Sequence, residues 1–143
     1  MVFAIMGCSY GFMPETRCND IESLCYYVNE NIDYVYDWDS VYDTKEYYQS
    51  PMETESLRTG DCEDFTIYFM YIAYKEFGIK PDFAVVKVDD LGYHALAKYD
   101  GSYYDSTTGI IFESLPWVFE ELFIIDYDTI MLFSTSFYTK SID

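Results

Sequence analysis

The two residues with the clearest chemical potential are Cys62, at a predicted helix start, and His94, the only histidine in the chain. A thiol in the first turn of a helix feels the positive end of the helix dipole and unpaired backbone N–H groups, and both lower the pKa of a cysteine. The adjacent carboxylates of Asp61, Glu63 and Asp64 act against this, because negative charge disfavours a thiolate. Cys62 therefore needs a cationic partner to act as a nucleophile, and His94 is the histidine that can supply it.

A predicted hairpin brings one particular carboxylate to His94. The dipeptide Asp100-Gly101 is a strong signal for a two-residue turn between two strands. With that turn, His94 and Asp105 lie on one face of the sheet as diagonal neighbours, about 7 Å apart at the backbone. A carboxylate that accepts the imidazole N–H fixes the tautomer of the ring, as a Cys-His-Asp triad requires. A change of register by one residue would move Asp105 to the opposite face.

These residues also have an ordinary structural interpretation. A buried cysteine in a helix often serves as a small hydrophobic residue. A single histidine in a strand is more often a core or edge residue than a catalyst. The spacing of the residues by itself leaves both interpretations open.

A first helix is predicted over residues 21–35 from apolar positions three and four residues apart, with Asn19 or Asp20 as its cap. Cys25 lies on the apolar stripe, which predicts a core residue. A disulfide between Cys18 and Cys25 would need one of them outside a helix, since seven helical residues separate Cα atoms by about 10 Å.

After an acidic, irregular connection over residues 37–60, a second helix is predicted from Asp61 to about Phe77. Asp61 and Asp64 approximate a capping box at its start, and Gly78 ends it. Its nearly uniform apolar surface is typical of a central, buried helix. Strands are predicted over residues 83–88, 93–99 and 102–107, then a short helix within 113–122 and one or two strands over 123–138. Helices followed by an antiparallel sheet predict an α+β domain.

Three segments, in this order, resemble the transglutaminase-like superfamily, which has a papain-like cysteine fold: Gly60-Asp61-Cys62-Glu63-Asp64, Tyr93-His94-Ala95 and Tyr104-Asp105-Ser106-Thr107. They most resemble the bacterial transglutaminase-like cysteine peptidases, whose upstream segment also matches around Ser50-Pro51-x-Glu53-Thr54. The resemblance covers about residues 20 to 108 of the chain. It implies a transglutaminase core in which a central helix carrying the cysteine packs on an antiparallel sheet carrying the histidine and the aspartate.

The resemblance also implies roles for individual residues. Cys62 would be the nucleophile, His94 the general base and acid, and Asp105 the orienting carboxylate. In some bacterial members the acidic residues beside the cysteine bind calcium, which here means Asp61 and Glu63. These two residues serve equally well as an N-cap and a first-turn charge. The chain departs from the family at position 106, where a serine stands in place of the proline that many members carry.

The implied reaction is cysteine-dependent acyl transfer on peptide or amide bonds. Water as the acceptor gives a cysteine peptidase or amidase, which the short chain favours, and an amine gives a cross-linking transglutaminase. The oxyanion donors are expected among the backbone N–H of Cys62 and the side chains of Tyr48 and Gln49. Two alternatives stay open: a catalytically idle module that binds peptides or a partner, and an acidic calcium-dependent interaction protein. The triad chemistry requires no cofactor, and calcium is the one metal expected.

Composition limits the partners of this chain. The 143 residues carry a net charge of −18, yet half of them are hydrophobic and 21% are aromatic. This length suits one domain, and the apolar content excludes a disordered acidic tail. So few basic residues cannot neutralise a run of phosphates, which excludes sequence-independent nucleic-acid binding. An anionic membrane surface should repel the chain, so a basic protein or peptide substrate is expected.

The N-terminal segment is expected to lie outside the domain. Residues 1–18 form an arm or the remnant of a lipoprotein signal, because Ile5-Met6-Gly7-Cys8 resembles a lipobox. A single transglutaminase-like domain is expected over residues 19–143. The lipobox predicts an extracytoplasmic protein, lipid-anchored through Cys8, and an ordinary arm predicts a cytoplasmic one. No stretch of the sequence is long and apolar enough for a transmembrane segment.

Overall fold

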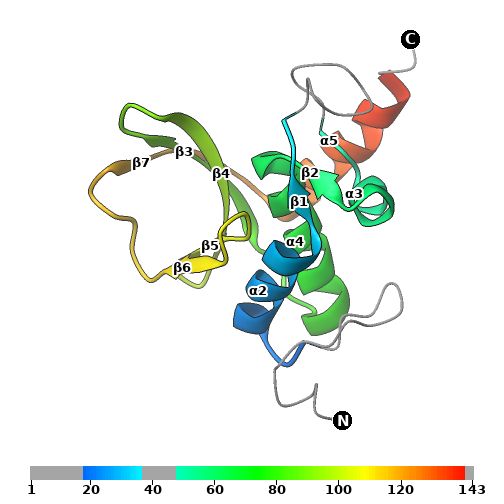
Figure 1. The fold of residues 1–143 in the computed structure, drawn as a ribbon, viewed down its shortest axis with the longest axis horizontal. Helices are drawn as coiled ribbons and strands as arrows, with labels where there is room; N and C mark the ends of the chain where they lie inside the picture. Colours follow the sequence, from blue (N-terminus) through cyan, green and yellow to red (C-terminus); the bar gives the residue numbers. More distant parts are fainter. Residues whose placement is uncertain (1–17, 37–47, 141–143) are drawn as a thin grey trace.

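The computed structural model describes residues 18–36 and 48–140, with side chains as far as Ser134. Helices gather on one side of the molecule and a curved sheet lies on the other (Figure 1). The helices are α2 (Ile21–Asn31), α3 (Pro51–Leu57), α4 (Cys62–Phe77) and α5 (Tyr127–Lys140). The antiparallel sheet, in the order β6-β5-β4-β3-β7, consists of β3 (Asp82–Val88), β4 (Gly92–Tyr99), β5 (Ser102–Asp105), β6 (Ile110–Phe112) and β7 (Phe119–Ile125). This architecture confirms the predicted α+β class.

The central helix α4 begins and ends where the sequence predicts. The side chain of Asp61 accepts from the backbone N–H of Asp64, and the Asp64 side chain accepts from the backbone N–H of Asp61. Gly78 ends the helix in the left-handed conformation, with φ of 71°, which a residue without a Cβ adopts at no steric cost. All residues from Asp64 to Met70 are buried, so α4 forms the centre of the core.

The β4–β5 hairpin has the predicted register. Tyr99 pairs with Ser102 across the turn. Asp100 and Gly101 have φ of 51° and 84°, the positive values that a tight type I′ turn needs at both central residues. The register pairs β5 with the second half of β4 and brings Asp105, at the end of β5, toward the middle of β4.

The sheet separates two clusters of buried side chains. The cluster shared with α2 and α4 takes from the sheet Phe83, Ala95, Ala97 and Tyr104, with Val85 packed against it. A smaller cluster takes Ala84, Val86, Leu96 and Tyr103 from the opposite face, with Leu115 of the β6–β7 connection packed against it. His94 pairs with Val86 on β3, so strand alternation assigns His94 to the second face.

The first helix is shorter than predicted. It ends at Asn31, Ile32 is extended, and the backbone N–H of Val35 donates to Gly60 at 2.8 Å. This backbone belongs to a two-stranded parallel pair of β1 (Asp33–Tyr34) and β2 (Thr59–Gly60). Ile32 and Val35 continue the helical spacing, but β-branched residues also suit extended backbone, and the pairing with β2 decides the outcome.

The connection predicted as irregular contains helix α3. Ser50 caps it, accepting from the backbone N–H of Glu53, whose side chain accepts in return from the backbone N–H of Ser50. Pro51 occupies the first turn, where its missing N–H costs nothing. The capping signals were present in the sequence, but seven residues are too few to show an apolar period.

The prediction for the C-terminal part was wrong in two places. Residues 113–122 form no helix but a turn followed by the start of β7, and residues 127–140 form α5 where strands were predicted. Asp126 accepts from the backbone N–H of Thr129 at 2.8 Å, and Tyr127 and Ile130 are buried three residues apart. Aromatic and β-branched residues with high strand propensity concealed this helical spacing.

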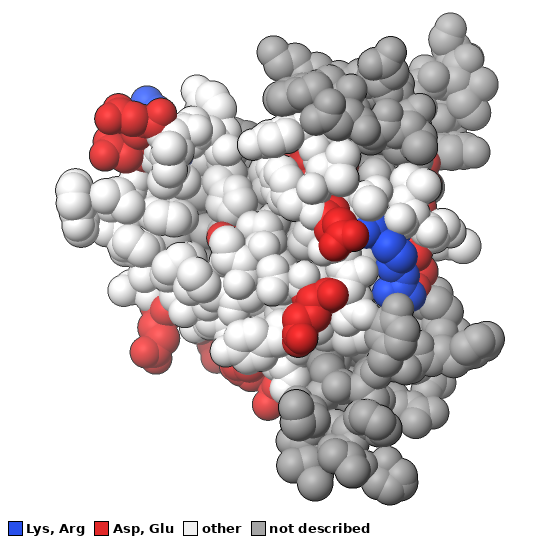
Figure 2. All heavy atoms as spheres, in the orientation of Figure 1, with Lys and Arg blue, Asp and Glu red and all other residues white. Residues whose placement is uncertain are grey.

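Some predictions fall on residues outside the described ranges, namely the N-terminal arm with its lipid anchor at Cys8 and most of the acidic connection over residues 37–47. Cys18 is disulfide-bonded, whereas Cys25 is a free, buried cysteine, so the two do not pair with each other. Within the described ranges, none of the helices has the length and apolar character needed to cross a membrane. The face of the sheet seen in Figure 2 is mostly uncharged, with acidic side chains near its borders.

Candidate active site

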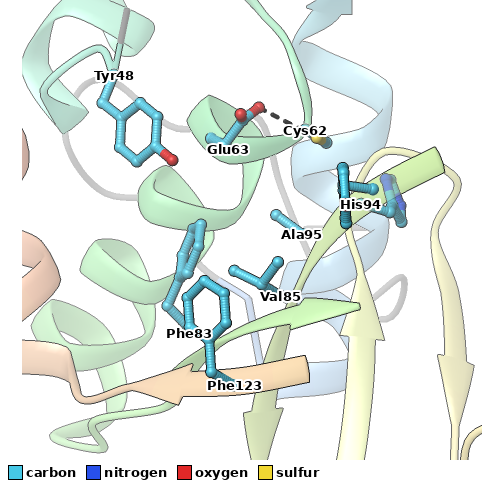
Figure 3. A pocket seen from close by; sticks show the side chains of 9 residues that line it. Tyr48, Cys62, Glu63, Phe83, Val85, His94, Ala95 and Phe123 are labelled. Atoms are coloured by element: carbon cyan, nitrogen blue, oxygen red, sulfur yellow. Dashed lines mark hydrogen bonds between the residues drawn. The ribbon is translucent and has the colours of Figure 1, made fainter. Parts of the chain in front are cut away.

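Cys62 and His94 line the same pocket. Cys62 is the first residue of α4, and His94 lies near the start of β4. The pocket has a volume of about 180 Å³ and is lined by Tyr48, Cys62, Glu63, Phe83, Val85, Tyr93, His94, Ala95 and Phe123. Figure 3 shows Cys62 and Glu63 together on the helix, and Phe83, Val85 and Phe123 forming an apolar wall. The nucleophile and the base predicted from the sequence therefore share one cavity.

Asp105 accepts a hydrogen bond from His94, as the predicted register of the hairpin requires. The Nε2 atom of His94 lies 3.1 Å from Oδ2 of Asp105. A carboxylate partner at this nitrogen favours the tautomer with the proton on Nε2, which leaves Nδ1 as a basic lone pair. Nδ1 is therefore the ring atom of His94 that could accept the proton of the Cys62 thiol.

Strand alternation assigns His94 to the sheet face away from α4, yet the start of α4 reaches the same pocket. The reason is that β5 pairs with β4 only along Ala97 to Tyr99. Beyond that point the first two turns of α4 lie against β4: the hydroxyl of Thr66 donates to the Ala95 carbonyl at 3.2 Å, and the Ala95 N–H donates to the Cys62 sulfur. The helix start thus takes the place of a neighbouring strand and lies at the edge of the sheet where His94 is held.

The surroundings of the Cys62 thiol favour its protonated form. The thiol donates to Oε2 of Glu63 at 3.1 Å. Burial raises the pKa of the thiol well above its ordinary value, and the charge and hydrogen bond of Glu63 and the charge of Asp61 raise it further, while the hydrogen bond from Ala95 lowers it. Burial, together with the carboxylates beside Cys62, therefore outweighs the favourable position at the helix start.

Asp105 is an ionised, largely buried carboxylate. Burial raises its pKa, but the hydrogen bond and charge of His94 and two hydrogen bonds from Thr107 lower the pKa more, and the net result lies below the ordinary value. The Thr107 backbone N–H donates to Oδ1 at 3.1 Å and its hydroxyl donates at 2.5 Å. Asp105 can therefore support a protonated imidazole without taking the proton itself.

The three predicted oxyanion donors differ in position. As the first residue of α4, Cys62 has a backbone N–H with no acceptor inside the helix. Tyr48 lines the pocket, with its hydroxyl directed into it in Figure 3. Gln49 is buried and is not among the lining residues: its backbone N–H donates to Asp64 and its side-chain oxygen accepts from Thr54, both at 2.8 Å.

The two residues predicted to bind calcium have other contacts here. The Asp61 side chain caps α4, and Glu63 accepts from the Cys62 thiol. Within the described ranges, no group of three or more His, Cys, Asp or Glu side chains is placed to hold a metal ion. Calcium takes six to eight oxygen ligands, so the side chains of the described residues do not by themselves form a calcium site.

Sequence reasoning missed the apolar wall and the thiol contact of Glu63. Phe83 and Val85 alternate along a predicted strand, so their shared face could have been recognised. Phe123 belongs to the sheet edge beside Val85, a pairing over 38 residues that no local signal reports. Glu63 was recognised only as a nearby charge.

No protein-family profile and no curated protein matches this sequence. Solved structures do share its fold. Legionella pneumophila LapG superposes with a TM-score of 0.64 at 19% identity, covering 86% of this chain and 77% of that chain. An EGTA-treated form of the same protein gives 0.61 at 19% identity, covering 73% of this chain and 61% of that one.

A Cytophaga hutchinsonii protein described as a candidate cysteine protease gives a TM-score of 0.51 at 17% identity. It covers 85% of this chain, which spans only 39% of that longer protein. At such low identities the likeness shows the fold alone. The fold of this chain is thus a papain-like, transglutaminase-like α+β fold.

Proposed function

We propose that this protein is a cysteine-dependent enzyme that transfers acyl groups from peptide or amide bonds, with water as the usual acceptor. The observation that carries the proposal is the pocket that Cys62 and His94 both line, while the Asp105 carboxylate lies 3.1 Å from the imidazole. The fold shared with LapG and with a candidate cysteine protease supports it.

In the proposed reaction, Nδ1 of His94 takes the proton of the Cys62 thiol. The thiolate attacks the carbonyl carbon of the scissile bond and forms a tetrahedral oxyanion, to which the Cys62 backbone N–H donates. Collapse of this intermediate breaks the C–N bond, and the His94 imidazolium gives its proton to the leaving amine. Water, deprotonated by His94, then attacks the thioester, releases the carboxylic acid and restores the thiol.

The first step requires the thiol to leave Glu63. In the structure its proton points to a carboxylate that cannot help in catalysis, because a carboxylate is too weak a base to hold the proton of a thiol. Rotation of the Cys62 side chain away from Glu63 and toward the imidazole would begin the reaction. The cavity beside the sulfur gives the side chain room for this rotation.

The small volume of the cavity favours one side chain of a peptide over a separate small molecule. Its volume of about 180 Å³ lies below the roughly 300–1,000 Å³ of typical small-molecule sites. Phe83, Val85 and Phe123 offer an apolar wall, and among the described residues Glu63 is the one carboxylate in the lining. We therefore propose peptide substrates with an apolar side chain beside the scissile bond, and a basic residue near Glu63 as an additional preference.

Alkylation of the native protein with iodoacetamide near pH 6 tests the activated thiol. Cys62 should be modified, and the His94→Ala variant should lose most of that reactivity while it stays folded. Cys25 is a control inside the same molecule, because its side chain is fully buried and is not part of the pocket lining. A Cys62 that reacts no faster than in His94→Ala would refute the enzyme proposal.

The acyl acceptor is tested with a pool of synthetic peptides, analysed by mass spectrometry with and without a fluorescent primary amine. Hydrolysis predicts cleaved peptides with free carboxylates, and amine transfer predicts products that carry the label. Cys62→Ala, which lacks the sulfur, should abolish both products. A protein that binds the peptides but leaves them intact would be the idle binding module.

Calcium at Asp61 and Glu63 is a separate proposal. A metal that binds the folded state raises the melting temperature. We expect added calcium to raise the melting temperature of protein first treated with a chelator, and Glu63→Gln to reduce that rise. An unchanged melting temperature would refute the calcium proposal and would not affect the proposed triad.

A further inference from the structure

The turn after β5 is built around the side chain and backbone of Asp105. Its carbonyl oxygen accepts from the backbone N–H groups of Thr108 at 3.2 Å and Gly109 at 2.7 Å. Its Oδ1 atom accepts two further hydrogen bonds, from the backbone N–H and the hydroxyl of Thr107. Only Oδ2 is left to face His94. The turn therefore determines which carboxylate oxygen meets the imidazole.

The same turn is attached to helix α2 through Asn29. The side-chain amide of Asn29 donates to the backbone carbonyl of Thr107 at 2.7 Å. Gly109 lies close to the same helix, since a Cβ at that position would stand 3.4 Å from Tyr26 and 3.5 Å from Asn29. Residues 78 positions apart in the sequence thus join α2 to the carboxylate of the site.

We propose that Thr107 and Asn29 are positioning residues of the active site: Thr107 orients the Asp105 carboxylate, and Asn29 holds Thr107 in the place where it can do so. This inference rests on the proposed function, because it gives Asp105 the task of orienting His94. Neither residue touches the reacting atoms, so each acts through Asp105.

The physical effect is on the tautomer of His94. A carboxylate with Oδ1 fully engaged presents one oxygen in one direction to Nε2–H. When Thr107 donates less or is displaced, the carboxylate can rotate and the ring can turn, so that the proton also occupies Nδ1. An imidazole with a proton on Nδ1 cannot accept the proton of Cys62.

The single histidine of the chain makes this measurable without a substrate. Nitrogen-15 NMR of the imidazole reports the tautomer of His94 with no overlapping signal. The test variants are Thr107→Val, which keeps the shape and loses the hydroxyl, and Asn29→Asp, which replaces the donor by an acceptor. Thr107→Ser retains the hydroxyl and should behave like the original protein.

Two neighbouring residues provide matched controls. Thr108 is exposed in the same turn, and its hydroxyl lies 3.4 Å from the backbone carbonyl of Asp105 rather than from the carboxylate. Asn31 is on the same helix, and its side-chain amide donates at 2.8 Å to Tyr27 within that helix. Thr108→Val and Asn31→Asp should therefore leave the His94 tautomer and the Cys62 alkylation rate unchanged.

We expect the original protein to hold neutral His94 as the Nε2–H tautomer. Thr107→Val and Asn29→Asp should show a measurable share of the Nδ1–H form, and an alkylation rate of Cys62 about tenfold lower, as for a lost hydrogen bond to a charged group. Melting curves identify variants that merely unfold. If Thr107→Val unfolds, the comparison of Thr107→Ser with Thr107→Ala tests the role of the hydroxyl instead.

The inference is overturned when folded Thr107→Val and Asn29→Asp keep both the tautomer and the alkylation rate of the original protein. Failure of the proposed function looks different: His94→Ala would then leave the reactivity of Cys62 unchanged. The NMR comparison still decides the role of Thr107 and Asn29 in that case, because it reads the imidazole directly.

Discussion

The Cys62 thiol donates to Glu63 at 3.1 Å and must part from it before His94 can take its proton. Replacement of Glu63 by glutamine removes a negative charge beside the sulfur and should lower the pKa of the thiol. A lower pKa increases the thiolate fraction at neutral pH, about tenfold for a fall of one in the pKa. We expect a correspondingly faster alkylation of Cys62, measured between pH 6 and pH 8.

Glu22→Gln is the matched control, since Glu22 is an exposed acid in the first turn of the other core helix. It removes the same charge at a distance from Cys62 and should leave the rate nearly unchanged. An equal acceleration in both variants would mean that overall charge, and not the contact with Glu63, restrains the thiol.

Asp105 makes the stability of the fold depend on acid. Its pKa in the folded protein lies below the ordinary value of 3.8, so the unfolded chain binds a proton more readily than the folded one. The stabilisation is fully present above about pH 4 and is lost as the pH falls through the lower pKa of the folded state. Asp105→Asn should therefore flatten the decline of unfolding free energy in this acidic range.

Urea unfolding at several pH values between about 5 and 2.5 measures this difference. Asp100→Asn serves as the control, because Asp100 is exposed in the hairpin turn at a φ of 51° that asparagine also adopts readily. It should show the same decline as the original protein. An identical decline in Asp105→Asn would contradict the assigned hydrogen bonds of the Asp105 carboxylate with His94 and Thr107.

At the scale of elements, the start of α4 depends on a close approach between Gly60 and Asp64. A Cβ at position 60 would stand 2.6 Å from the Cβ of Asp64. Asp64 is fully buried, and its carboxylate accepts hydrogen bonds from the backbone N–H groups of Asp61 and Gln49. Gly60→Ala should therefore destabilise the fold by about 1–3 kcal/mol and also reduce the His94-dependent reactivity of Cys62. Urea unfolding and alkylation measure the two effects.

Gly78→Ala provides a contrast at the other end of the same helix. Its φ of 71° is unfavourable for alanine, but no atom lies within 4 Å of the added Cβ. The variant should lose about 1 kcal/mol of stability and keep the reactivity of Cys62. Loss of reactivity in both variants in proportion to stability would show that the helix start has no special importance.

The sequence predicts elements well where the signal is local. The capping box at Asp61, the stop at Gly78 and the Asp100-Gly101 turn are each written in a few adjacent residues, and the structure has all three. The β1–β2 pairing and the position of Phe123 depend on partners more than 20 residues away, which local patterns do not report. The helix α5 was missed because its aromatic residues favour strands when no neighbour is known.

For the whole molecule, composition predicted a globular core but not the use of its aromatic residues. Several of the 17 tyrosines are buried, among them Tyr27, Tyr68 and Tyr104. Tyr68 donates to Glu55, which also pairs with Arg58 at 2.6 Å and so attaches α3 to α4. Such a buried polar network has no signature in the sequence, because its members come from separate elements. One of the buried tyrosines, Tyr68, thus joins two helices.

The net charge of −18 should act on every molecule that approaches Cys62. Both the overall field and the local charge come from carboxylates. Among the described residues, the lining of the pocket contains Glu63 and no Lys or Arg. Small methanethiosulfonate reagents that differ only in charge test this, because they form the same mixed disulfide with the thiol. We expect the ammonium reagent to react fastest with Cys62 and the sulfonate reagent slowest, with the neutral one between them.

Salt separates this effect from contacts within the pocket. Raising the ionic strength from about 0.01 M to 1 M shortens the Debye length from about 30 Å to 3 Å, so the difference due to the whole molecule should largely vanish. The part that survives at high salt belongs to Glu63 and should be lost in Glu63→Gln. Equal rates for the three reagents at low salt would contradict a preference for cationic partners, and the basic substrates proposed for this pocket would then lose their electrostatic support.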